Sequence, residues 1–130
     1  MKILIIDDDA NVTRAIQRTM REHEIVLATD PTAALQQIAD AALTLPFELV
    51  LCDARMPTMT GFQVLAALRS HREPPVFVLM SGDDALIDTV DGADAFLVKP
   101  FKSADLRAAI ARIRAAKAAA RTMRIPYVAA

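Results

Sequence analysis

The amino-acid sequence predicts an α/β domain built on a five-stranded parallel sheet with helices on both faces. Five short apolar runs of strand length recur along its 130 residues, at positions 3–6, 25–28, 47–52, 76–80 and 95–98. Segments with the apolar spacing of amphipathic helices separate these runs. Because parallel strands need long crossover connections that are usually helical, the alternation favours a doubly wound sheet with right-handed crossovers.

The helical segments are indicated by apolar spacing and by capping residues. Apolar side chains recur at helical intervals after each of the first three strands, as Val12, Ile16 and Met20, then Ala34, Leu35 and Ile38, then Phe62, Leu65 and Leu68. Asp30, which precedes Pro31 and Thr32, provides N-terminal capping chemistry for the second helix. Ser103 and Asp105 provide it for the last helix.

The composition excludes several classes of protein. Fifteen basic residues stand against sixteen acidic ones, so no global attraction to nucleic acid or to anionic membrane is expected. No apolar run approaches the roughly eighteen residues that span a bilayer. Asp7 to Asp9 interrupt the only apolar stretch near the start, so no signal peptide is expected and the domain is predicted to be cytoplasmic. Three glycines in the whole chain leave no Gly-rich phosphate-binding loop.

The first strand runs directly into three consecutive aspartates, Asp7, Asp8 and Asp9. A strand made only of apolar residues is buried, so the carboxylates that follow it are held at the edge of a core. Adjacent carboxylates repel each other, which favours a shared hard divalent cation with oxygen ligands. The alternative is a solvated acidic turn in which Asp9 or Asn11 caps the next helix.

Polar residues also stand at the ends of three other strands, as Asp53, Ser81 and Lys99. The carboxyl ends of parallel strands share one edge of the sheet, and ligands bind there where the strand order reverses. In the common order 2-1-3-4-5 the first and third strands are neighbours, so Asp7, Asp8 and Asp53 are predicted to converge. Each of these residues has an ordinary interpretation as a cap, a turn former or a solvated charge, but their combination at one edge predicts a site.

These motifs resemble those of the receiver domains of bacterial two-component response regulators, which have a flavodoxin-like fold. The acidic motif of the first strand is matched by ILIIDDD, the phosphoacceptor motif by LVLCDARMPTMTG, the switch-hydroxyl segment by VFVLMSG, and the lysine followed by proline by DGADAFLVKPF. The resemblance covers about residues 2 to 118. We therefore expect a receiver domain at residues 1–118 and a C-terminal tail or the start of a linker at 119–130.

The resemblance implies that Asp53 accepts a phosphoryl group from a sensor histidine kinase or a histidine phosphotransfer protein. It further implies that Asp7, Asp8, Asp53 and the main-chain carbonyl of Arg55 hold Mg²⁺. Asp53 must be ionised to act as a nucleophile, and the neighbouring carboxylates raise its pKa when no metal is present. Metal is therefore expected to be required for phosphorylation.

Lys99 and Ser81 are the other residues to which the resemblance assigns roles at the phosphoryl group. Lys99 neutralises charge, and Ser81 moves inward to donate a hydrogen bond, after which Phe96 follows as the second switch residue. The bond between Lys99 and Pro100 is a cis peptide in such domains. The domain is not expected to be an enzyme beyond catalysing its own phosphorylation and dephosphorylation, and its downstream partner is not identified by the sequence.

The chain departs from the family pattern in two places. Only seventeen residues lie between Ser81 and Lys99, about one helical turn fewer than usual, so the fourth of five expected helices is predicted to be short or irregular. The domain is accordingly not expected to form the family's usual dimer through the face that contains this helix. Arg55 and Asp83 also carry opposite charges on either side of the predicted pocket. Two alternatives remain open for them: they pair across its mouth and impede water, or both are solvated.

The remaining polar candidates are predicted to be structural. Cys52 precedes Asp53 on a buried strand and is expected to act as a small apolar residue. His23 and His71 follow the first and third helices, and neither is assigned a metal or phosphoryl role. Residues 103–130 carry six basic side chains against Asp105 alone, which is best explained as a solvated helix face.

Two other functions remain open at this stage. An aspartate-dependent phosphohydrolase would use Asp7 as the nucleophile and Asp9 as the general acid, but 130 residues leave no room for a cap over the substrate. A protein-binding module that is never phosphorylated would not need the complete set of acids, hydroxyl and lysine.

Overall fold

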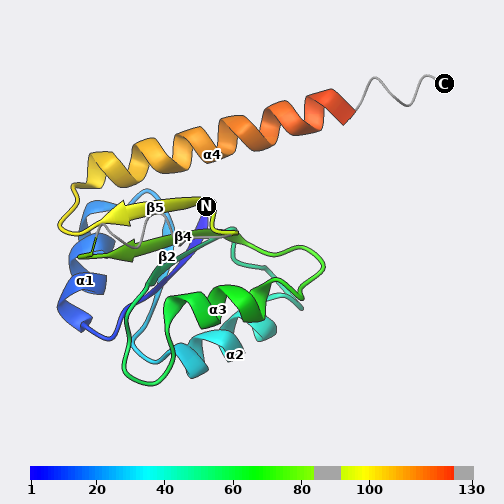
Figure 1. Cartoon of the computed structure of the whole chain (residues 1–130). Coiled ribbons are helices and arrows are strands. Elements are labelled where there is room, and N and C mark those ends of the chain that lie inside the picture. The colour runs from blue at the N-terminus through cyan, green and yellow to red at the C-terminus, as the bar shows by residue number, and fades with distance from the viewer. Residues whose placement is uncertain (84–91, 125–130) are drawn as a thin grey trace.

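The computed structural model describes residues 1–83 and 92–124, with side chains as far as residue 120. Strands and helices alternate along the chain as β1 (Lys2–Ile6), α1 (Ala10–Thr19), β2 (Glu24–Ala28), α2 (Pro31–Ala41), β3 (Leu49–Asp53), α3 (Gly61–Leu68), β4 (Val76–Ser81), β5 (Ala95–Val98) and α4 (Ser103–Arg124) (Figure 1). The strands lie where the apolar runs predict them. The third strand begins two residues after the start of its apolar run. Phe47, the first residue of that run, is buried in the segment that leads into the strand.

All five strands are parallel and lie in the order β2-β1-β3-β4-β5, as predicted. The central strand β1 pairs with β2 on one side and with β3 on the other, so the strand order reverses between β1 and β3. Ile6 is the register partner of Cys52 in this pairing. The residues that follow these two, Asp7 and Asp53, therefore emerge side by side.

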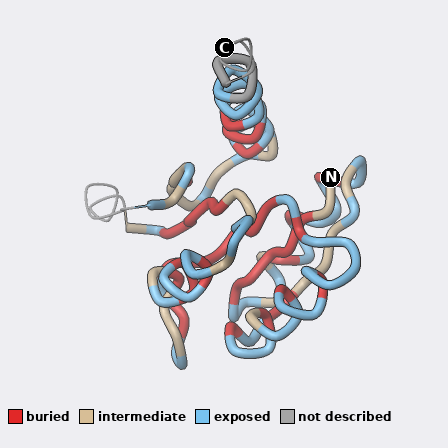
Figure 2. Tube along the Cα trace, turned by 90° about the vertical axis from the view of Figure 1, so that its right-hand side faces the viewer, coloured by how far each residue is buried: buried red, intermediate tan, exposed pale blue. Residues whose placement is uncertain are grey.

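The two faces of the sheet are covered by different helices. Alternate residues of a strand point to opposite faces. Leu4 and Ile6 join the apolar cluster formed with α2 and α3, whereas Ile3 and Ile5 join the cluster formed with α1 and α4. The buried residues are concentrated along the strands between these two helical layers (Figure 2). This core fixes the strand ends, and with them the loops at the carboxyl edge.

Side-chain caps begin the helices close to that edge. Asp9 accepts a 2.9 Å hydrogen bond from the Asn11 amide at the start of α1, and Asp30 accepts one of 3.1 Å from the Thr32 amide at the start of α2. Both caps were expected from the sequence. At α4 the capping carboxylate is Asp105, which accepts from the Lys102 amide at 2.9 Å, while Ser103 is the first residue of the helix.

Four helices are present in the part of the chain that the structure describes. The fourth of the five predicted helices falls on residues 84–91, which lie outside the described residues, as does the prediction about the dimer face that contains it. None of the described helices is both long and apolar enough to cross a membrane. Helix α4 is the longest at 22 residues, and it continues well past the end of the sheet (Figure 1).

Candidate functional site

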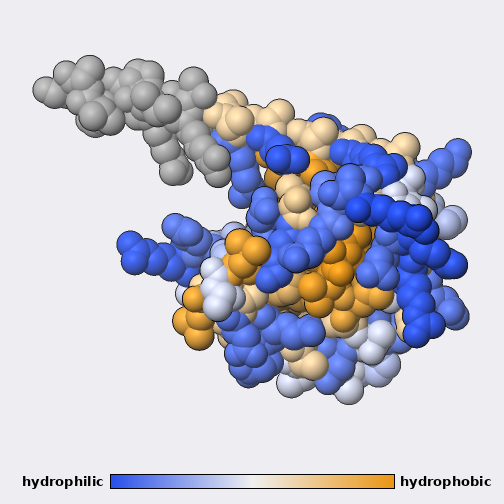
Figure 3. All heavy atoms as spheres, turned by 180° about the vertical axis from the view of Figure 1, so that it is seen from behind, coloured by the Kyte–Doolittle hydropathy of each residue, from blue (hydrophilic) through white to orange (hydrophobic). Residues whose placement is uncertain are grey.

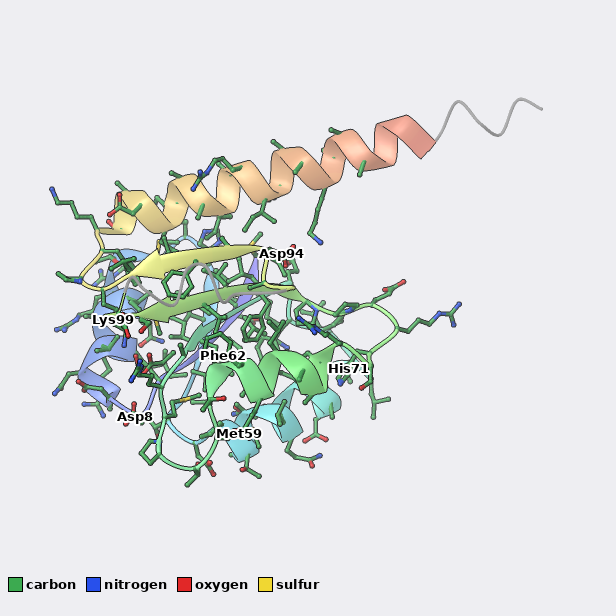
Figure 4. The ribbon with its side chains drawn as sticks, viewed as in Figure 1. Asp8, Met59, Phe62, His71, Asp94 and Lys99 are labelled. Atoms are coloured by element: carbon green, nitrogen blue, oxygen red, sulfur yellow. The ribbon has the colours of Figure 1, made fainter. Side chains whose placement is uncertain are left out.

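The polar strand endings meet at the carboxyl edge of the sheet. Asp7 and Asp8 follow β1, Asp53 is the last residue of β3, Ser81 is the last residue of β4, and Lys99 follows β5. Figure 4 shows Asp8 and Lys99 at this edge, toward which the strand arrows point, whereas His71 and Asp94 lie toward the opposite end. The convergence predicted from the strand order is confirmed.

Three carboxylates form the centre of this edge. Asp7, Asp8 and Asp53 each offer an oxygen atom, and these oxygens lie within 4.8 Å of one another. Asp7 is 1% exposed and Asp53 7% exposed, whereas Asp8 is exposed to solvent. One buried oxygen of Asp7 accepts a 2.9 Å hydrogen bond from the Asp9 amide, which fixes its orientation.

The Lys99 ammonium group is the cation closest to these acids among the described residues. Its Nζ lies 2.7 Å from Asp7 Oδ2 and 3.5 Å from Asp53 Oδ1. The backbone holds the lysine in place, because the Lys99 amide donates a 2.7 Å hydrogen bond to the Ser81 carbonyl and the bond to Pro100 is cis, as the resemblance implied. The sequence pointed to contact with the phosphoacceptor, but the stronger contact is with Asp7.

The electrostatics of Asp53 are unfavourable to its charged form. Burial raises the pKa of the Asp53 carboxyl, the Asp7 carboxylate raises it further, and Lys99 offsets only part of the effect. Burial opposes the charge of Lys99 as well, but hydrogen bonding and attraction to Asp7 and Asp53 leave the pKa of its ammonium group raised. The lysine is therefore charged at neutral pH, and the pocket still lacks positive charge.

The donor set fits a hard divalent cation. It consists of carboxylate oxygens without sulfur or imidazole nitrogen, which is the ligand preference of Mg²⁺ and Ca²⁺. The pKa of Asp53 is raised because too little positive charge stabilises its ionised carboxylate. A divalent ion would supply that charge. Asp7, Asp8 and Asp53 are the described side chains whose oxygens lie close enough together to hold it.

A glycine that sequence reasoning did not single out holds the phosphoacceptor strand in place. A Cβ atom on Gly61 would lie 2.4 Å from the Asp53 carbonyl oxygen and 2.9 Å from Ala54 Cα. The Gly61 amide also donates a 3.0 Å hydrogen bond to the Ala54 carbonyl. Helix α3 can pack this closely against the end of β3 only because residue 61 has no side chain.

Ser81 and Phe96 occupy the neighbouring strands β4 and β5, and their side chains have different surroundings. Ser81 is 2% exposed, and its hydroxyl accepts a 3.1 Å hydrogen bond from the Asp83 amide. Phe96 on β5 is the register partner of Leu79 and packs, half-buried, against the cluster on the α2 and α3 face. Ser81 is thus the residue that ends β4 at the carboxyl edge of the sheet, whereas the Phe96 ring belongs to the apolar packing of β5.

Of the two alternatives for Arg55 and Asp83, the structure shows the ion pair. Arg55 Nη2 lies 2.8 Å from Asp83 Oδ2, so the loop after β3 is joined to the loop after β4. Both side chains remain substantially exposed, at 67% and 42%. The pair thus joins the two loops that follow Asp53 and Ser81.

The residues predicted to be structural, Cys52, His23 and His71, are not among the residues that form the acid site. Cys52 is fully buried, and burial raises the pKa of its thiol far above the ordinary value, so the thiol is unreactive in the folded protein. His23 lies in the turn before β2, and burial lowers the pKa of its imidazole. His71 follows α3 at the opposite end of the sheet from Lys99 (Figure 4).

An open parallel sheet that gathers carboxylates, a hydroxyl and a lysine at its carboxyl edge, where the strand order reverses, is typical of doubly wound α/β domains, which bind their ligands at this edge. Residues 3–111 match the family model of the response regulator receiver domain. The chain therefore belongs to the response regulator receiver family.

Individual relatives agree with this assignment. The transcriptional regulatory protein PrrA of Mycobacterium leprae is 38% identical over 120 residues, covering 88% of this chain and 48% of the relative. The chemotaxis response regulator CheY4 of Vibrio cholerae is 26% identical with a TM-score of 0.72, covering 86% of this chain and 97% of that structure. TrrA of Thermotoga maritima, crystallised in complex with Mg²⁺ and BeF, is 22% identical with a TM-score of 0.75 and covers 86% and 97%. The chain spans about half the length of the curated relatives that it matches.

Proposed function

We propose that this domain receives a phosphoryl group on Asp53 from a sensor histidine kinase or a histidine phosphotransfer protein. The observation that carries the proposal is the placement of the Asp53 carboxylate, at the end of a buried strand, beside Asp7, Asp8 and the Lys99 ammonium group. This arrangement provides a nucleophile together with the positive charge that phosphoryl transfer needs. Our proposal includes no enzymatic activity beyond the domain's own phosphorylation and dephosphorylation.

The chemistry asks little of the protein beyond positioning and charge neutralisation. An Asp53 oxygen attacks phosphorus in line with the leaving nitrogen of a phosphohistidine. The new P–O bond forms as the P–N bond breaks, and the electron pair of that bond stays on the imidazole nitrogen. Lys99 Nζ, which lies 3.5 Å from Asp53 Oδ1, is placed to stabilise the charge on the transferred oxygens.

Mg²⁺ is the cofactor that this proposal includes. Asp7, Asp8, Asp53 and the main-chain carbonyl of Arg55 would hold the ion, which supplies charge neutralisation to the phosphoryl oxygens. Three of these four groups are carboxylates whose oxygens already lie together. A structural neighbour, TrrA, is described in complex with Mg²⁺ and BeF, which is consistent with this choice of ion.

Ser81 and Phe96 are proposed to report the phosphorylated state. A phosphoryl group brings about −1.5 to −2 charges and three strong acceptor oxygens. The Ser81 hydroxyl, now accepting from the Asp83 amide, would turn to donate to one of those oxygens. Phe96, which is half-buried on the neighbouring strand β5, would then change its packing.

Within a longer regulator, residues 1–118 are proposed to be the receiver and 119–130 a tail or the start of a linker. The boundary lies inside α4, so a linker would begin as a continuation of that helix. Several relatives are named transcriptional regulatory proteins. The proposal assigns no nucleic-acid or membrane contact to the receiver itself and places it in the cytoplasm.

Incubation with acetyl phosphate and Mg²⁺, followed by intact-mass spectrometry, tests the proposal. We expect one labile phosphoryl adduct that disappears in Asp53→Asn and when EDTA replaces the metal. Asp9→Asn is the matched control and should retain the adduct, because Asp9 caps α1 instead of contributing to the acid cluster. Continuous turnover that depends on Asp7 would indicate the phosphohydrolase, and no adduct under any condition would indicate the binding module.

A further inference from the structure

A hollow lies at the amino end of the sheet, opposite the phosphoacceptor site. Its volume is about 700 Å³. The floor includes Phe47, Pro74 and Val76, and the side wall comes from Ala115 and Ala118 of α4. We call this hollow the amino-end groove. It lies where α4 extends beyond the sheet at this end instead of stopping at the edge of the core (Figure 1).

Two leucines next to the amino-end groove are exposed although they are large and apolar. Leu43 is 86% exposed and Leu45 is 62% exposed, and they are the exposed large apolar residues of the described chain. They stand in the loop after α2, whose next residues, Pro46 and Phe47, line the groove. Separate apolar areas are visible on this end of the molecule below the projecting α4 (Figure 3). We call Leu43 and Leu45 the leucine knob.

The backbone of the leucine knob is held in place by hydrogen bonds. The Leu43 amide donates to the Asp40 carbonyl at 3.2 Å, and Lys2 Nζ donates to the Leu45 carbonyl at 2.7 Å. Lys2 also lies over the ring of Phe47, 4.6 Å from its centroid. The two leucines are thus presented to solvent on an ordered loop, so little conformational entropy would be lost if a partner covered them.

Charges of both signs surround the amino-end groove. Glu48 and Glu73 line it from the loops of the sheet, whereas Arg114 and Lys117 line it from α4. All four are exposed, and among the described residues no ion pair joins either cation to either acid. The surface therefore combines a projection with a hollow, and acidic groups with basic ones.

We propose that this surface is the contact between two copies of the chain related by a two-fold axis. A two-fold interface uses the same surface on both partners, so the surface must be complementary to itself. The leucine knob of one copy would enter the amino-end groove of the other, and the reverse contact would form at the same time. Arg114 and Lys117 of each copy would face Glu48 and Glu73 of its partner. A partner of a single charge sign would leave either the acids or the cations without opposite charges. A partner that only filled the groove would leave the leucine knob exposed.

This interface does not depend on the proposed phosphorylation. It lies at the end of the sheet opposite Asp53 and uses none of the residues at the acid site. Dimerisation is therefore measured on the unphosphorylated protein, and Asp53→Asn should associate like the unaltered chain. The outcome of this test and that of the phosphorylation test are independent.

Sedimentation velocity of the whole chain over a wide concentration range tests the interface. We expect a concentration-dependent dimer, and we expect Leu43→Asp with Leu45→Asp to raise the dissociation constant by about a hundredfold or more. Each leucine is buried twice in a two-fold dimer, so each substitution acts twice. The melting temperature of this variant at low concentration should match that of the parent chain, because both leucines are exposed in the monomer.

Charge reversal on α4 separates this face from general electrostatic effects. Lys117→Glu should weaken the dimer, and adding Glu73→Lys should restore part of the affinity by reversing the opposing charge. Arg112→Glu is the matched control, because it makes the same change at an exposed position of the same helix outside the groove. A chain that stays monomeric at every concentration would overturn the proposal. So would a dimer whose affinity is unaffected by the leucine and Lys117 substitutions, since that dimer would use a different face.

Discussion

Lys99 donates its 2.7 Å hydrogen bond to Asp7, while its distance to the phosphoacceptor Asp53 is 3.5 Å. Asp7 is the most deeply buried acid of the site at 1% exposure, so the lysine in this structure serves mainly to compensate a charge that water cannot reach. A metal ion at the acid cluster would take over that compensation. The lysine then becomes available to the oxygens of a phosphoryl group.

Lys99→Ala is expected to destabilise the metal-free protein by about 3 kcal/mol, because it leaves the buried carboxylate of Asp7 without its cation. Urea denaturation in EDTA measures the loss. Mg²⁺ should restore much of the stability, since it supplies positive charge to the same carboxylate. The double variant Lys99→Ala with Asp7→Asn is the control, and it should be more stable in EDTA than Lys99→Ala alone.

Asp53→Asn is expected to raise the melting temperature of the metal-free protein at neutral pH. Burial and the Asp7 carboxylate raise the pKa of Asp53 above its ordinary value of 3.8, so the folded state disfavours the ionised form. Stability is therefore greatest below the unfolded pKa and falls as the pH rises through the folded pKa. The higher melting temperature of Asp53→Asn should therefore be seen at pH values above the folded pKa of Asp53, and the difference should disappear in acid. Glu24→Gln, at an exposed position of β2, removes one charge elsewhere and should not reproduce the pattern.

Gly61→Ala is expected to reduce the free energy of unfolding by about 1–3 kcal/mol, because its Cβ would overlap the Asp53 carbonyl oxygen and Ala54 Cα, which are backbone atoms that cannot rotate away. The same displacement should slow phosphorylation by acetyl phosphate. Gly82→Ala is the matched control for stability, since a Cβ there would meet nothing within 4 Å. Equal stability of the two variants would contradict the close-packing role of Gly61.

The fold and the members of the acid site could be predicted from the sequence because both depend on local information. Apolar runs mark buried strands, and parallel topology places their polar endings at one edge. Once β1 and β3 are neighbours, the pairing of Ile6 with Cys52 makes Asp7 and Asp53 adjacent.

Other features depend on distances that no local pattern contains. The preference of Lys99 for Asp7 results from the relative positions of β5 and β1, which are separated in the sheet by β3 and β4. The role of Gly61 depends on how closely α3 approaches β3, and a glycine before a helix does not by itself indicate such an approach. The amino-end groove exists only because α4 continues beyond the sheet, and a run of alanines gives no sign of what lies beside it.

His23→Gln is expected to reduce the loss of stability on acidification. Burial is the main cause that lowers the pKa of His23, the N-terminal ammonium group adds to it, and Glu22 opposes it. Because the folded state prefers the neutral imidazole, the contribution of His23 is present above the ordinary value of 6.5 and is lost as the pH falls below it through the lowered pKa of the folded state. Thermal melts across this range measure the effect.

Arg55→Ala is expected to accelerate hydrolysis of the phosphorylated protein, because the ion pair with Asp83 joins the loops that follow Asp53 and Ser81 and would restrict the approach of water to Asp53. An exposed pair contributes up to about 1 kcal/mol, which limits the effect to about fivefold in rate. Loss of the adduct after removal of acetyl phosphate gives the rate. Asp83→Asn should produce a similar acceleration, and the double variant should be no faster than either single one, since each change breaks the same pair. Additive effects, or an unchanged rate in Arg55→Ala, would show that the pair does not restrict water and that its two members act separately.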